Sequence, residues 1–196
     1  MHLRGHEVSA AHLPCDDTEA TLHDYAAAVP PADVVVGHSL GGLTIPLVRA
    51  KHRVYLCAFV PVWGKPTRAL FAERPLMPGF PDSGITRDER GRTVWVDEEF
   101  ALSAMYPDVD LKVALQTYAL LRPQAGTIYD GDYPLKRRPR GQVTSIVGRD
   151  DAAVSPEWSR RAARKRLGVE VVEIASGHSP MLSRPSDLAN LLDELL

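Results

Sequence analysis

Cysteine is scarce in this sequence, and two thiols cannot build a disulfide framework. Only Cys15 and Cys57 are present among the 196 residues, and Cys57 lies within an apolar run typical of a buried strand. Small proteins that depend on disulfides carry more cysteines and fold in oxidising compartments. We therefore expect a reducing, cytoplasmic location.

An excess of charge of either sign is also missing. The 25 acidic residues nearly balance the 23 basic ones. Proteins that bind nucleic acid or anionic membranes carry a marked basic excess, so neither partner is expected. The sequence shows no signal-peptide pattern, no apolar run of membrane-spanning length, no internal repeat and no low-complexity tract.

No spacing of His, Cys, Asp and Glu matches a known metal-ligand pattern. The densest group, formed by His6, His12, Cys15 and Asp16, is irregularly spaced. We expect neither a metal ion nor an organic cofactor. The length fits one domain, with room for a substantial core and an insertion.

The segment from Asp33 to Arg49 carries the strongest functional pattern. It reads DVVVGHSLGGLTIPLVR: a valine run typical of a parallel strand, then G-H-S-L-G, then an apolar stretch that predicts a helix. G-x-S-x-G between a strand and a helix is the nucleophile elbow. We predict Ser39 as a nucleophile, the backbone N–H of Leu40 as an oxyanion donor, and His38 as a packing residue. The alternative is a glycine-rich corner with an incidental serine.

The segments around this motif alternate in strand and helix character. Before and after the motif we predict a strand within 5–13, a helix over 18–29 capped by Asp17 or Thr18, and a strand over 53–60. Later we predict a strand over 142–147, a helix over 156–167, a strand over 169–175 and a helix over 187–196. This order predicts an α/β fold in which helices cover both faces of a mainly parallel sheet.

Residues 61–140 interrupt the alternation. They hold nine of the sixteen prolines, and we predict only two helices there, from Asp97 towards Tyr106 and from Asp108 or Asp110 to before Pro123. The segment also contains large apolar residues without periodicity: Trp63, Phe71, Met77, Phe80 and Trp95. We expect a lid that walls an apolar pocket, inserted into a core formed by residues 1–60 and 141–196.

A serine becomes a strong nucleophile only when a base removes its proton and an acid orients that base. In the elbow fold the acid and the histidine base follow the serine along the chain, each at the end of a later strand. Asp150 and Asp151 follow the strand predicted over 142–147, and His178 follows the one over 169–175. The G-x-x-D spacing from Gly148 favours Asp151, with Asp150 as the alternative.

These motifs resemble the α/β-hydrolase superfamily, and within it the small branch of plant methylesterases, hydroxynitrile lyases and bacterial esterases. The resemblance covers nearly the whole chain and rests on RGHEV at 4–8, GHSLGG at 37–42, YLCAFVP at 55–61, RDDAAVSPEW at 149–158 and GHSPMLSRP at 177–185. It implies a three-layer α/β-hydrolase fold with a triad of Ser39, Asp151 and His178. The lyases carry a lysine directly after the catalytic histidine, whereas Ser179 stands here, which favours hydrolysis.

One feature of that branch is not found ahead of RGHEV: a first strand and an HG-containing loop. In the family this loop supplies the second oxyanion donor, and the strand lies beside the elbow strand. We expect a natural start further upstream, with a damaged descendant as the alternative. We also expect weak aryl-ester hydrolysis by the chain as written, and a strand around Val8 that either stands apart from the elbow strand or pairs with it.

The leading functional prediction is a serine esterase that cleaves small or medium apolar carboxylic esters through an acyl-enzyme. The alternative is a ligand-binding protein of little turnover on the same scaffold. The expected partner is a small-molecule ester. The oligomeric state stays open, a homodimer included.

Overall fold

The computed structural model describes residues 1, 4–80 and 84–195. The helices are α1 (Leu22–Ala27), α2 (Glu98–Met105), α3 (Leu111–Tyr118), α4 (Pro156–Ala162), α5 (Pro180–Ser183) and α6 (Pro185–Asp193). The strands are β1 (Ala32–His38), β2 (Ala50–Leu56), β3 (Ile85–Arg87), β4 (Thr93–Trp95), β5 (Gln142–Gly148) and β6 (Val172–Ile174). The described residues also form short helical turns: η2 (Ser39–Leu43), η3 (Ile45–Leu47), η4 (Thr67–Glu73), η5 (Thr127–Tyr129) and the π-turn η6 (Ala163–Leu167).

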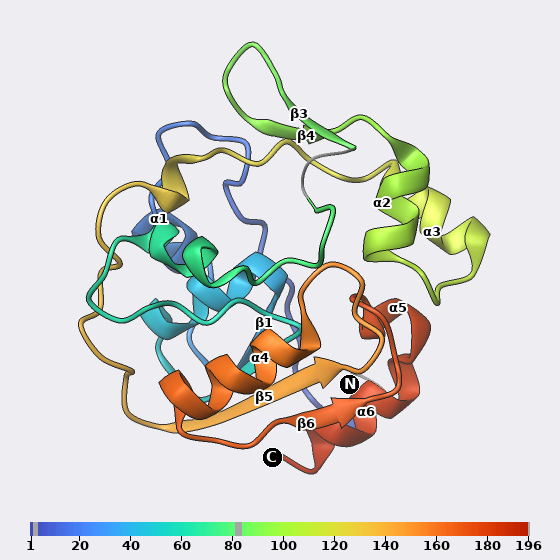
Figure 1. Cartoon of the computed structure of the whole chain (residues 1–196). Helices are drawn as coiled ribbons and strands as arrows, with labels where there is room; N and C mark the ends of the chain where they lie inside the picture. Colours follow the sequence, from blue (N-terminus) through green and yellow to red (C-terminus); the bar gives the residue numbers. More distant parts are fainter. Residues whose placement is uncertain (2–3, 81–83, 196) are drawn as a thin grey trace.

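In the part of the chain that the structure describes, four parallel strands form the main sheet, in the order β1-β2-β5-β6. Because the strands are parallel, their carboxyl ends lie at one edge of the sheet, where open α/β proteins build their sites. In Figure 1 the arrows of β5 and β6 point towards the same end, near which α5, α2 and α3 are drawn. The predicted α/β class with a mainly parallel sheet is confirmed.

Helices pack against both faces of this sheet, because side chains of a strand alternate between its faces. Tyr55 of β2 joins one apolar cluster with Tyr25 of α1 and Trp158 of α4. Val54, its neighbour in β2, joins a second cluster with Leu188 of α6. The result is a three-layer arrangement of helix, sheet and helix.

The prediction of an apolar helix after the G-H-S-L-G turn is wrong, because the chain forms the two short turns η2 and η3 there instead. Pro46 explains the difference, because proline has no N–H to donate and its ring clashes with the carbonyl four residues earlier. The helix predicted over 18–29 begins late, at Leu22. Its N-cap is Thr21, which forms a reciprocal capping box with Asp24, rather than Asp17 or Thr18.

The strand predicted within residues 5–13 is also wrong. These residues form no ladder with β1 or with any other described strand. They are mostly exposed, so that water can satisfy their backbone groups. The segment therefore stands apart from β1, which is an edge strand of the described sheet, and Val36 of β1 keeps 40% of its surface exposed.

Residues 61–140, which we call the inserted segment, contain η4, the β3–β4 hairpin, α2, α3 and η5. The two predicted helices are confirmed, with Asp97 and Asp110 as their N-caps. The hairpin was not predicted; its strands are only three residues long. Leu70, Ile128 and Tyr133 are buried in the cluster that includes Trp158, so the inserted segment packs onto the core.

Boundaries in the last third differ modestly from the prediction. The predicted strand over 142–147 is β5, and the strand predicted over 169–175 shortens to β6. The helix predicted over 156–167 continues as the π-turn η6 after Ala162, and α6 begins at Pro185. The predicted end of that last helix at Leu196 lies outside the described residues. Among the residues that are described, no helix has the length and hydrophobicity to cross a bilayer.

Candidate active site

Ser39 occupies a strained turn directly after β1. Its φ of +52° lies in the left-handed region, which costs a non-glycine residue about 1–3 kcal/mol. Gly37 makes the turn possible, because a Cβ there would lie 2.7 Å from the carbonyl oxygen of Gly41. Gly42 is required as well, since its Cβ would lie 2.1 Å from the carbonyl oxygen of Phe59, whereas a Cβ on Gly41 would meet nothing. The tight corner predicted from the motif is therefore present.

Leu40 follows Ser39 in the first turn of η2. Backbone N–H groups at the start of a helical turn have no partner within the turn. The N–H of Leu40 therefore needs a partner outside this turn, and its role as an oxyanion donor remains a prediction.

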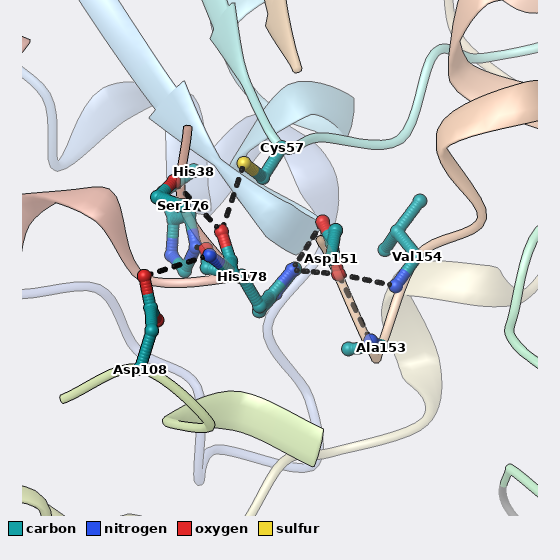
Figure 2. A network of polar contacts seen from close by, with 9 residues as sticks. His38, Cys57, Asp108, Asp151, Ala153, Val154, Ser176 and His178 are labelled. Atoms are coloured by element: carbon teal, nitrogen blue, oxygen red, sulfur yellow. Dashed lines mark hydrogen bonds and ion pairs between the residues drawn. The ribbon is translucent and has the colours of Figure 1, made fainter. Parts of the chain in front are cut away.

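The two candidate acids differ sharply in environment. Asp151 is buried, and its carboxylate oxygens lie 2.9 and 3.0 Å from Nδ1 of His178 (Figure 2). The N–H groups of Ala153 and Val154 also donate to Oδ1 of Asp151, at 2.9 and 2.8 Å. Asp150 is exposed to solvent. Of the pair, Asp151 alone is seen to contact His178.

The contact with Asp151 fixes how His178 is protonated. A carboxylate can only accept, so Nδ1 carries the proton and Nε2 of the neutral ring is left as an acceptor. The His178 side chain is fully buried, and its Nε2 has no hydrogen-bond partner among the residues that the structure describes. An unpaired basic nitrogen held in this way is suited to remove a proton from a neighbouring group.

His38 supports the loop that carries His178. Its Nε2 donates to the backbone carbonyl of His178 at 2.8 Å, and the two ring centroids lie 4.7 Å apart. Burial, together with the neighbouring His178, lowers the pKa of His38 to about 3. His38 is therefore neutral at ordinary pH and serves as a structural donor, in agreement with its predicted packing role.

Two further residues at this edge of the sheet were not predicted. Asp108, from the loop between α2 and α3, accepts a hydrogen bond from the N–H of Gly177 at 2.9 Å. Cys57, just beyond β2, is buried with a φ of +46° and places its Sγ 4.0 Å from the carbonyl oxygen of Gly177. Burial raises the pKa of the Cys57 thiol to about 12, so this thiol is not a competing nucleophile.

The chain thus brings the predicted nucleophile, acid and base to one edge of the sheet. Ser39 directly follows His38, whose side chain donates a hydrogen bond to the His178 carbonyl. No hydrogen bond between Ser39 and His178 is present in the part of the chain that the structure describes. Such bonds are often long before substrate binds, and the catalytic roles of the three residues remain predictions.

Comparison with known proteins agrees with this architecture. Residues 2–191 match the sequence profile of the alpha/beta hydrolase family. A rice protein (Oryza sativa subsp. indica) named probable esterase PIR7A is 32% identical over 233 aligned positions, which cover 98% of this chain and 87% of the rice protein.

Solved structures of plant and bacterial proteins are similar as well. A mutant of polyneuridine aldehyde esterase superposes with a TM-score of 0.78 at 17% identity, covering 99% of this chain and 89% of the other. A pyrethroid hydrolase from Sphingobium faniae JZ-2 superposes with a TM-score of 0.69 at 20% identity, covering 90% of this chain and 78% of the other. A variant of tomato methylketone synthase I superposes with a TM-score of 0.68 at 23% identity, covering 88% of this chain and 77% of the other. The parallel sheet and these similarities lead to one conclusion: the chain belongs to the α/β-hydrolase family and has its fold.

Proposed function

We propose that this protein hydrolyses small or medium apolar carboxylic esters through a covalent acyl-enzyme. Ser39 is the nucleophile, His178 the general base and then acid, and Asp151 the residue that orients His178. One observation carries the proposal: a buried Asp151–His178 pair, with Nε2 of His178 unpaired, lies at the sheet edge where the strained Ser39 turn ends.

The enzyme class is that of the carboxylic ester hydrolases. The curated rice relative is named a probable esterase, and solved relatives include an esterase and a pyrethroid hydrolase. The sequence adds that Ser39 stands in a G-x-S-x-G turn and that Ser179, not lysine, follows His178. Both features favour hydrolysis over cyanohydrin cleavage.

In the acylation step, Nε2 of His178 takes the hydroxyl proton of Ser39 while Oγ bonds to the ester carbonyl carbon. The carbonyl oxygen becomes an oxyanion, to which the N–H of Leu40 donates. The buried carboxylate of Asp151 stabilises the imidazolium that forms. The tetrahedral intermediate then collapses, the C–O bond to the alcohol breaks, and the alcohol leaves with the proton from Nε2.

In the deacylation step, water replaces the alcohol. Nε2 of His178 takes a proton from water as the oxygen attacks the acyl carbon, and the proton returns to Oγ of Ser39 as the carboxylic acid leaves. Both steps use the same base from one fixed position. The Asp151–His178 contact is therefore needed throughout the cycle.

The preference for apolar esters rests on the inserted segment. Its backbone bonds to the loop of the acid, where the N–H of Met77 donates to the carbonyl of Ala153 at 3.0 Å. Asp108 binds the loop of the base. These two contacts, and the many apolar side chains in the segment, support the proposal that it walls an apolar ester site.

Hydrolysis of p-nitrophenyl esters of increasing acyl length tests the proposal. Under rapid mixing we expect release of nitrophenol that requires Ser39, with a burst of up to one equivalent of enzyme for those esters whose deacylation is slower than their acylation. Ser39→Ala should abolish the burst, while ester binding, followed by tryptophan fluorescence, should persist. A wild-type protein that binds the esters but releases no nitrophenol above the uncatalysed rate would instead be the ligand-binding protein of the alternative prediction.

A further inference from the structure

A side chain of the inserted segment binds the loop that follows β6 and carries His178, which we call the base loop. Asp108 lies between α2 and α3, and its Oδ2 accepts the N–H of Gly177, the residue before His178, at 2.9 Å. A Cβ on Gly177 would lie 2.7 Å from Cγ of Pro107 and 2.8 Å from Oδ1 of Asp108. Glycine at 177 is therefore what lets the two loops approach so closely.

The backbone of His178 is held on both sides. On the far side of the residue, His38 donates to the His178 carbonyl at 2.8 Å, and Figure 2 shows Asp108 and His38 reaching the same loop. The bond to Asp108 has an ionised acceptor, and such hydrogen bonds are shorter and about twice as strong as neutral ones. One anchor comes from the elbow and the other from the inserted segment.

The loop that follows β5 and carries Asp151, which we call the acid loop, is attached to the same segment through main-chain hydrogen bonds. The N–H of Ser155 donates to the carbonyl of Pro75 at 2.8 Å, and Leu76 forms an isolated bridge with Val154. Truncating the side chains at these positions leaves the main-chain bonds in place. Asp108, in contrast, holds the base loop through its side chain. A single substitution at Asp108 can therefore remove this attachment.

We propose that Asp108 is a positioning residue, which couples the inserted segment to the orientation of His178. Its catalytic consequence rests on the proposed ester hydrolysis. Without the carboxylate the Gly177 N–H has no protein acceptor, and the flexible glycine peptide can rotate. A displacement of about 1 Å at a reacting group can cost roughly 10²-fold in rate, even when it arises away from the chemistry.

Three variants test the kinetic consequence. Asp108→Ala removes the acceptor, Asp108→Asn keeps a weaker neutral one, and Glu99→Ala removes the charge of an exposed carboxylate on α2 that makes no contact with the base loop. In Asp108→Ala we expect kcat for a p-nitrophenyl ester to fall about 10- to 100-fold with KM within about twofold. Asp108→Asn should lie between this variant and the wild type, and Glu99→Ala should match the wild type.

A proton NMR measurement tests the positioning without relying on turnover. The proton on Nδ1 of His178 is shared with buried Asp151, and its low-field signal should be sharp in the wild type and in Glu99→Ala. In Asp108→Ala we expect this signal to broaden or disappear, and the amide signal of Gly177 to move. Thermal unfolding identifies any variant that fails to fold, in which case Asp108→Asn provides the test.

The outcomes separate the two proposals. Unchanged Nδ1 and Gly177 signals in folded Asp108→Ala, or a kcat within twofold of the wild type, overturn the role of Asp108. An inactive wild type whose Nδ1 signal nevertheless depends on Asp108 overturns ester hydrolysis and keeps the positioning role. A fall in kcat that Glu99→Ala reproduces would mean that charge alone, and not the contact, is responsible, and would also overturn the role.

Discussion

Replacing Asp151 with asparagine should disable His178 while leaving the fold almost unchanged. The N–H groups of Ala153 and Val154 both donate to Oδ1 of Asp151. An asparagine must therefore keep its oxygen at that position, because an NH₂ group there would face two donors. Its NH₂ group then occupies the place of Oδ2, 2.9 Å from Nδ1 of His178.

This arrangement forces the wrong tautomer on the base. The amide donates to Nδ1, so the ring proton moves to Nε2, and Nε2 can no longer accept a proton from Ser39. Amidation of a triad aspartate lowers kcat about 10⁴-fold in a serine protease, equivalent to about 5.4 kcal/mol of transition-state stabilisation. We expect a loss of this order in the acylation burst of Asp151→Asn.

Asp150→Asn is the matched control, because it makes the same chemical change at the preceding, exposed residue. Its burst rate with p-nitrophenyl butyrate should stay within about threefold of the wild type, since surface substitutions away from a site have small effects. Equal losses in the two variants, or a larger loss at Asp150, would refute the assignment of the acid. Thermal unfolding of both variants checks that they remain folded.

Three further predictions concern stability. Ser39→Gly should raise the melting temperature while abolishing turnover, because glycine relieves a left-handed strain of about 1 kcal/mol or more; an unchanged or lower melting temperature would argue against that strain. Gly42→Ala should lower the free energy of unfolding, measured in urea, by about 1–3 kcal/mol, because its Cβ would clash with the Phe59 carbonyl. A Cβ at Gly41 would meet nothing, so Gly41→Ala should lower the free energy of unfolding by less than Gly42→Ala. The pKa of His38 is lowered to about 3 in the folded state, so the unfolded state binds the extra proton between pH 6.5 and 3. Stability should therefore fall with decreasing pH in that window by at most about 1.4 kcal/mol per unit, and His38→Gln should show a shallower fall; an equal slope would contradict the shift.

The tight turn at Ser39 and the positions of Asp151 and His178 after β5 and β6 could be predicted because their signals are local. Three valines followed by G-H-S-L-G specify a strand and a tight turn within a dozen residues, and the loops after β5 and β6 carry Asp151 and His178 directly. The prediction of a helix after the Ser39 turn was wrong because one residue, Pro46, disfavours a helix despite the apolar pattern around it. The prediction of a strand around Val8 was wrong because a strand forms only with a partner, and no described strand pairs with this segment.

Asp108 could not have been predicted from its surroundings in the sequence. It lies in an irregular part of the inserted segment, and its partner Gly177 is 69 residues away along the chain. Nothing in the composition or periodicity near either residue indicates that they touch. Contacts of this kind depend on how two loops fold back over the sheet, which only the three-dimensional structure records.

The central claim is that Ser39 is activated by a base that Asp151 holds in place. A fluorophosphonate probe reacts covalently with an activated serine, and peptide mass spectrometry locates the adduct. We expect one adduct, on the peptide containing Ser39, with no labelling in Ser39→Ala and a labelling rate at least 100-fold lower in His178→Ala, in line with the roughly 10²–10⁴-fold effect of a general base. A wild-type protein that stays unlabelled, or that is labelled equally well without His178, would contradict the account.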